Sequence, residues 1–140
     1  MRDLLFVYGT LQPGASAWHL LRPWTTGPPR PAVLPGALYD TGLGYPALDL
    51  NRAGEGDGGP EGGVGVTGWV VELRAPSATA LTVLDSYEGS EYQRVLVALP
   101  DGVVCWTYVW IAGFDGMRRL STPWPARTDE MRRPCAEGSG

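Results

Sequence analysis

Glu88 is the residue of this chain best placed for acid–base chemistry. The segment 77–88 has helical spacing, and at about 100° per residue Glu88 returns to within roughly 20° of Leu81, seven positions earlier. The carboxylate is therefore expected on the same side as Leu81 and Leu84, with Asp85 at the edge of that side. Loss of water raises the pKa of a carboxyl group toward the range of a general base, which makes Glu88 a candidate catalytic residue. The alternative is a solvated carboxylate in a frayed last turn.

A second chemical feature is the sequence Tyr8-Gly9-Thr10-Leu11, which follows a short apolar run. A strand that ends in such a turn exposes consecutive backbone N–H groups. These groups can hold a carboxylate or an oxygen that gains negative charge. The alternative is an ordinary glycine turn, because a four-residue pattern of this kind also arises by chance.

Tyr92 and Arg94 are secondary candidates, because Tyr92 follows Glu88 by four residues across Gly89. The segments 92–99 and 103–111 alternate as strands, and Asp101-Gly102 between them predicts a hairpin with a two-residue turn. That register places Tyr92 and Arg94 on one face with Leu96, Cys105, Thr107 and Val109, and it places Val95, Val97, Trp106, Tyr108 and Trp110 on the other. The alternative is structural: a tyrosine that anchors the corner and an arginine that lies on the sheet surface.

The elements that must position these residues are mainly strands. Pro76-Ser77 opens the helix, with Ser77 as the expected N-cap and Gly89 at its end. Strands are expected at 4–8, 32–39, 45–50 and 64–73, with a helical turn at 17–21 that Arg22-Pro23 ends. The segment 54–63 contains six glycines and is expected to be a mobile surface loop.

Composition limits the classes of function. The chain has 140 residues, which suits one domain, and its net charge of −4 argues against binding to nucleic acid or to an anionic membrane. The apolar run 4–8 is too short for an export signal or a membrane span, so a cytoplasmic protein is expected. Cys105 and Cys135 have neither disulfide nor ligand spacing, and no metal or cofactor is expected.

Other catalytic designs fit the sequence less well. His19 is the only histidine, so a Ser-His-Asp or Cys-His arrangement would have to use it, and the G-x-S-x-G pattern is absent. Next to Trp18, His19 is expected on the surface of a helical turn. The chain also lacks the phosphate-binding pattern G-x-x-x-x-G-K-[ST].

The chain resembles the γ-glutamylcyclotransferase-like superfamily, including its AIG2-like members. The resemblance spans roughly 4–111 and rests on motifs in the family's order: Val7-Tyr8-Gly9-Thr10-Leu11, Pro35-Gly36-Ala37-Leu38-Tyr39-Asp40, Gly44-Tyr45-Pro46-Ala47-Leu48, Leu84-Asp85-Ser86-Tyr87-Glu88-Gly89 and Tyr92-Gln93-Arg94. It implies an α+β fold, with a small mixed β-barrel flanked by short helices and a cavity at the barrel mouth. The domain would cover 1–113, followed by a Pro/Arg-rich closing tail at 114–140 with a disordered end.

The resemblance also implies roles for individual residues. Tyr8, Gly9, Thr10 and Leu11 would bind a γ-glutamyl group, and Glu88 would accept a proton. The substrate would be a small γ-glutamyl compound, and intramolecular attack of its α-amine would release 5-oxoproline and a free amine or amino acid. A non-catalytic module that binds a small molecule or a peptide on the same fold is the alternative. The partners expected are the small-molecule substrate alone, with no nucleic acid and no membrane, and the protein is expected as a monomer or weak homodimer.

Overall fold

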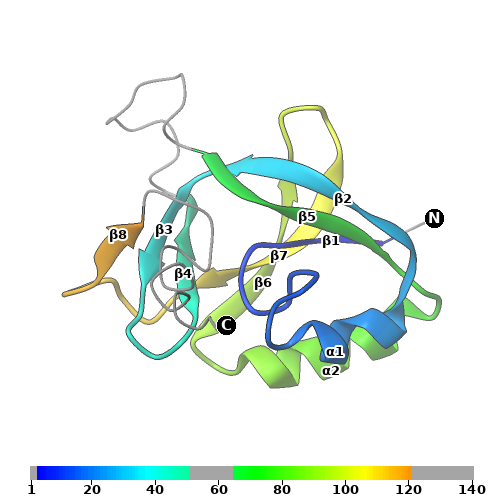
Figure 1. Cartoon of the computed structure of the whole chain (residues 1–140), viewed down its shortest axis with the longest axis horizontal. Helices are drawn as coiled ribbons and strands as arrows, with labels where there is room; N and C mark the ends of the chain where they lie inside the picture. The colour runs from blue at the N-terminus through cyan, green and yellow to red at the C-terminus, as the bar shows by residue number, and fades with distance from the viewer. Residues whose placement is uncertain (1–2, 51–64, 121–140) are drawn as a thin grey trace, which may run out of the picture.

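The computed structural model describes residues 3–50 and 65–120, and it has an α+β fold with a sheet-dominated core and few helices (Figure 1). The loop predicted at 54–63 and the end of the predicted tail, 121–140, lie outside the described residues. The elements in chain order are β1 (Leu4–Val7), α1 (Trp18–Leu21), η1 (Arg22–Trp24), β2 (Thr25–Pro35), β3 (Ala37–Asp40), β4 (Pro46–Asp49), β5 (Gly65–Leu73), α2 (Ser77–Glu88), β6 (Tyr92–Ala98), β7 (Val104–Trp110) and β8 (Arg118–Leu120).

The strands form two sheets. The larger has the order β2-β5-β1-β7-β6, in which β1 runs parallel to β7 and the other pairs are antiparallel. The smaller has the order β4-β3-β8. Among the described strands β2 and β6 remain edges that do not pair with each other, so the expected closed barrel is not shown. Strand β8 lies beyond residue 113 and pairs with β3, Leu38 opposite Leu120.

The larger sheet is covered on both faces. One cluster of buried side chains joins this sheet to α1 and α2, which lie side by side in Figure 1, and the second joins it to the smaller sheet. Along β1 and the residue that follows it, Leu5 and Val7 belong to the helix side, whereas Phe6 and Tyr8 belong to the other. Burial on both faces explains why this strand is a continuous apolar run instead of an alternating one.

Gly68 allows the central strands to approach closely. A Cβ atom at this position would lie 2.3 Å from the Val7 carbonyl oxygen and 2.8 Å from the Phe6 ring. Real Cβ atoms do not come so close to backbone, so only glycine fits here. The approach fixes the end of β1, from which the loop containing Gly9 begins.

Helix α2 spans the predicted residues, and its buried side chains are Ala80, Leu81 and Leu84. Gly89 ends it with φ +84°, and its N–H donates to the Asp85 carbonyl at 3.1 Å. The predicted N-cap was wrong: Pro76 occupies that position, and the Ser77 hydroxyl donates to the Asp3 carboxylate instead. Helix α1 ends at Leu21, before Arg22 and Pro23 as predicted, and the chain continues as the 3-10 turn η1.

The hairpin β6–β7 forms where it was predicted, but its predicted register was wrong. The loop has three residues, Pro100 to Gly102, because Leu99 and Val103 already pair through an N–H···O bond of 2.8 Å. Gly102 has φ +93°, which is typical of a three-residue hairpin loop that ends in a bulge. One added loop residue moves the partner strand to its opposite face, so Arg94 lies opposite Tyr108 and Tyr92 opposite Trp110.

Candidate functional site

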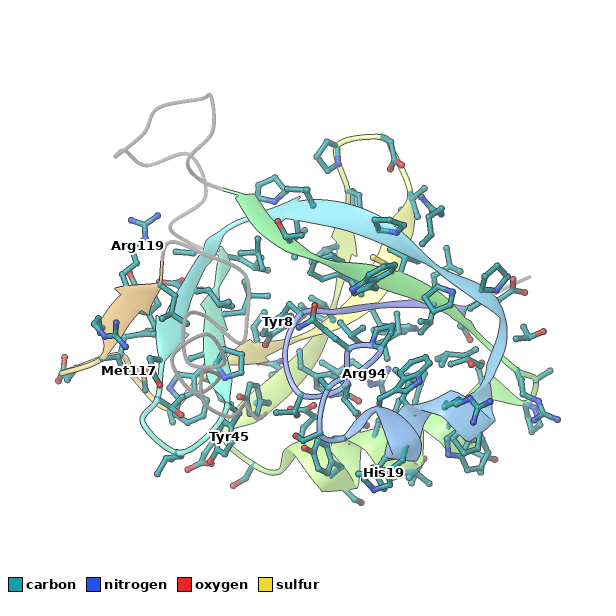
Figure 2. The ribbon with its side chains drawn as sticks, viewed as in Figure 1. Tyr8, His19, Tyr45, Arg94, Met117 and Arg119 are labelled. Carbon is teal, nitrogen blue, oxygen red and sulfur yellow. The ribbon has the colours of Figure 1, made fainter. Side chains whose placement is uncertain are left out.

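A pocket of about 170 Å³ lies where the loop after β1 meets the end of α2. It brings together the predicted residues Tyr8, Gly9, Thr10, Leu11, Glu88 and Tyr92, although they lie far apart in the sequence. The remaining lining residues are Phe6, Val7, Tyr45, Pro46, Tyr87 and Tyr108. Figure 2 shows Tyr8 in the interior of the molecule, whereas the exposed His19 lies on the outer side of α1.

The loop after β1 is fixed through its carbonyl groups. The Gln12 side chain donates to the Tyr8 carbonyl at 3.0 Å and to the Gly9 carbonyl at 3.1 Å, and the Ala17 N–H donates to the Thr10 carbonyl at 2.8 Å. Within residues 3–50 and 65–120, the N–H groups of Thr10 and Leu11 donate to no backbone carbonyl. Two residues that line the pocket therefore have backbone donors without a backbone acceptor in the described part of the chain.

Gly9 has a packing reason to lack a side chain. A Cβ atom there would lie 2.9 Å from Cγ of Pro46, at the start of β4. The Pro46 carbonyl in turn accepts a hydrogen bond of 2.5 Å from the Tyr92 hydroxyl. The Tyr92 ring packs edge-on against Trp110 of β7, with ring centroids 5.2 Å apart, so the Pro46 that contacts Gly9 is itself held by β6 and β7.

Helix α2 contributes a direct contact to this loop. The Thr10 hydroxyl and the Tyr87 hydroxyl share a hydrogen bond of 2.9 Å. Tyr87 immediately precedes Glu88, so this bond joins the two halves of the candidate site. Because Tyr87 is an exposed side chain, it lies at the open side of the pocket.

Glu88 is partly buried in the pocket and is not the fully solvated helix end that was the alternative. Burial, with a smaller contribution from the negative charge of Asp85, raises the pKa of Glu88 from 4.5 to about 7. A carboxyl group with that pKa exchanges protons readily near neutral pH. The structure therefore supplies a group suited to general acid–base chemistry at the position that the sequence indicated.

Three tyrosines of the pocket wall use their hydroxyl groups elsewhere. Tyr8 donates to the Tyr108 carbonyl at 2.6 Å, Tyr92 to the Pro46 carbonyl, and Tyr108 to the Asp85 carboxylate at 2.7 Å. Burial raises the pKa of all three phenols well above the ordinary value, so they remain neutral. Among the lining residues, Glu88 has the only carboxyl group, and none of the others is an arginine, lysine or histidine.

Arg94 does not line the pocket. Its guanidinium makes two hydrogen bonds to Asp85, of 2.9 and 3.1 Å, and lies 4.4 Å from the ring centroid of Trp106. The structure thus satisfies Arg94 within the protein and does not support the prediction that it reaches a substrate. Sequence reasoning also missed Tyr45, Tyr87 and Tyr108 as lining residues. Tyr45 and Tyr87 stand within the family motifs, which was a usable signal, whereas the wrong hairpin register concealed Tyr108.

The described residues contain no group of three or more His, Cys, Asp or Glu side chains that could hold a metal ion. In the same part of the chain, none of the helices has the length and apolar character needed to span a membrane. The fold and the site together define a small α+β protein with a tyrosine-walled pocket, which is also lined by a carboxyl group with a raised pKa and by the loop after β1.

Comparison with known proteins identifies the family of the chain. Residues 5–126 match the family described as gamma-glutamyl cyclotransferase, AIG2-like. The chain therefore belongs to that family. A protein of Halalkalibacterium halodurans named "Putative gamma-glutamylcyclotransferase BH1612" is 37% identical over 78 residues, which cover 53% of this chain and 62% of that relative's length.

Solved structures support the same fold. An AIG2-like protein from Mus musculus matches with a TM-score of 0.55 and 20% identity, over 80% of this chain and 79% of the other. Protein PH0828 from Pyrococcus horikoshii matches with a TM-score of 0.60 and 18% identity, over 93% and 92%. The solution structure of At3g28950.1 from Arabidopsis thaliana matches with a TM-score of 0.54 and 30% identity, over 82% and 67%.

Proposed function

We propose that this protein is a γ-glutamyl cyclotransferase that releases 5-oxoproline from a small γ-glutamyl amine, amino acid or isopeptide. The observation that carries the proposal is that Glu88 lines the same pocket as Thr10 and Leu11, whose N–H groups donate to no backbone carbonyl among the described residues. A proton acceptor and oxygen-binding donors are the two parts that this acyl transfer requires. Membership in the gamma-glutamyl cyclotransferase, AIG2-like family supports the same assignment.

The substrate carries its own nucleophile, which explains why the pocket needs no Ser, Cys or Lys. Attack of the α-amine on the γ-carbonyl carbon closes a five-membered ring. Such an intramolecular reaction has a large effective molarity. A bond forms between the amine nitrogen and the carbonyl carbon, and the bond from that carbon to the leaving nitrogen breaks. No water is consumed and no covalent intermediate with the protein forms.

In this mechanism Glu88 moves the proton. Its ionised carboxylate accepts a proton from the attacking amine, and its carboxyl group then returns a proton to the departing nitrogen. A pKa near 7 suits both steps, because neither form of the group is strongly disfavoured. The loop N–H groups would hold the oxygen that becomes negative in the tetrahedral intermediate. The neutral tyrosine rings would enclose the chain of the substrate.

The test is a panel of γ-glutamyl amines, γ-glutamyl amino acids and γ-glutamyl isopeptides, assayed for 5-oxoproline by chromatography. At least one class should react, and Glu88→Gln should abolish the release while calorimetry shows that the same compound still binds. Glu91→Gln, an exposed carboxylate in the same corner, is the matched control and should keep full turnover.

Two results would contradict the proposal. Full turnover by the Glu88→Gln protein would show that Glu88 is not the proton acceptor. Binding of a γ-glutamyl compound by the folded wild-type protein, without 5-oxoproline from any compound between pH 6 and 9, would favour the non-catalytic binding module.

A further inference from the structure

The Asp85 carboxylate is the centre of a network that the proposed reaction does not yet use. It accepts two hydrogen bonds from the Arg94 guanidinium, at 2.9 and 3.1 Å, and a third from the Tyr108 hydroxyl at 2.7 Å. The guanidinium is also stacked on Trp106, 4.4 Å from the ring centroid. Two parallel hydrogen bonds from a planar guanidinium fix the orientation of a carboxylate. Asp85 is therefore held more rigidly than is usual for a side chain near the surface.

This network meets the pocket at two points. Asp85 lies three residues before Glu88 on α2, and residues three apart are neighbours on a helix surface. On the other side, the Tyr108 ring lines the pocket, and its backbone carbonyl accepts the Tyr8 hydroxyl at 2.6 Å. A change at Asp85 would therefore reach both the proposed proton acceptor and Tyr108 in the pocket wall.

The charges near Glu88 come mainly from this network. In the described part of the chain, the titratable groups around it are Asp85 and Tyr87 on α2, Tyr8 after β1, Tyr45 before β4, Tyr92 on β6 and Tyr108 on β7. Arg94 on β6 is connected to Glu88 through its hydrogen bonds to Asp85. The hydrogen bond from Arg94 lowers the pKa of Asp85, so that carboxylate stays negative at neutral pH. Asp85 in turn raises the pKa of Glu88, after the larger effect of burial.

We propose that Asp85 is a positioning residue for the proposed reaction: clamped by Arg94, it fixes the Tyr108 wall and keeps one negative charge beside the Glu88 carboxylate. Arg94 then acts through Asp85, not through contact with a substrate. Because the two side chains carry opposite charges, their removal has opposite consequences for Glu88. An ion pair that only stabilised the fold, too far from Glu88 to act on its charge, would leave the Glu88 midpoint in place.

The experiment is a carbon-13 NMR titration of the Glu88 carboxyl group, assigned by its absence in Glu88→Gln. Asp85→Asn keeps an acceptor for Tyr108 but removes the charge, and it should lower the titration midpoint of Glu88 below 7 while leaving it above 4.5, because burial persists. Arg94→Met leaves Asp85 charged and uncompensated, and it should raise the midpoint above 7. The acidic limb of kcat/KM should move in the same directions as the NMR midpoint.

The surface pair Arg30–Asp101, 3.8 Å apart at the hairpin loop, provides matched controls. Arg30→Gln and Asp101→Asn also remove one charge each and should leave the Glu88 midpoint in place. Loss of activity with an unchanged midpoint, or a shift in the same direction for Asp85→Asn and Arg94→Met, would overturn the inference. The inference rests on the proposed function, but the NMR midpoints judge it separately, since a wild-type protein that releases no 5-oxoproline would refute the function alone.

Discussion

Replacement of Glu88 by glutamine should stabilise the folded protein, and the gain should depend on pH. The folded state raises the pKa of Glu88 from 4.5 to about 7, because burial disfavours the charged form. Below pH 4.5 the carboxyl group is protonated in both the folded and the unfolded protein, so its burial does not lower the free energy of unfolding through ionisation. As the pH rises toward 7 the unfolded state releases the proton first, so the folded protein loses stability, and above about 7 the loss is complete.

The size of this effect follows from the same values. At 1.36 kcal/mol per pH unit, an increase in pKa from 4.5 to about 7 corresponds to up to about 3 kcal/mol of free energy of unfolding. The neutral glutamine of Glu88→Gln avoids this cost at every pH. For a domain of this size, about 3 kcal/mol corresponds to a change in Tm on the order of 10 °C.

Urea unfolding, followed by tryptophan fluorescence at pH 4.5 and at pH 8, measures the effect. The stability difference between Glu88→Gln and wild type should grow by up to about 3 kcal/mol from the lower to the higher pH. Any constant packing difference cancels in this comparison. Glu91→Gln, which changes an exposed side chain, should alter stability by less than about 0.5 kcal/mol at both pH values. An equal difference for Glu88→Gln at both pH values would refute the argument that Glu88 is destabilised by burial.

Three further substitutions test how the pocket is built. Gly9→Ala places a Cβ atom 2.9 Å from Pro46, so we expect a several-fold increase in KM with a modest loss of Tm, whereas an unchanged KM would show that Pro46 moves freely. Tyr92→Phe leaves the Pro46 carbonyl without its hydrogen bond and should destabilise the protein by about 1–2 kcal/mol in urea unfolding, and a neutral result would argue against that bond. Gly68→Ala forces a Cβ atom to within 2.3 Å of a backbone oxygen and should largely prevent folding, as measured by circular dichroism, and a native spectrum would contradict the close approach.

Much of the fold could be predicted because local signals agreed with the final structure. The continuous apolar run of β1 indicated a strand buried on both faces, and Gly89 indicated the end of α2. Strand β2 was predicted only from residue 32, although it begins at Thr25. Its prolines argue against a strand, but at an edge of the sheet they are tolerated, since edge positions need fewer N–H donors. Which strands lie at edges is a property of the whole fold.

The candidate site shows the same division between local and long-range information. Helical periodicity predicted that Glu88 lies on the apolar side of its helix. The structure places it in the pocket together with the loop that contains Gly9. That convergence depends on β1 and α2 packing against one another, which no spacing within either segment reveals. Only the order of the motifs along the chain connected the two segments in advance. That order resembles a known family, and members of a family share a fold.

Arg94 shows how one residue in a loop decides a chemical role. With a two-residue turn, Tyr108 would lie on the opposite face from Arg94. The guanidinium would then be available to contact a substrate. The third loop residue, Pro100, shifts the pairing so that Arg94 lies opposite Tyr108. Both side chains then converge on Asp85, which accepts hydrogen bonds from each. The same shift therefore created the network that we propose controls the charge beside Glu88.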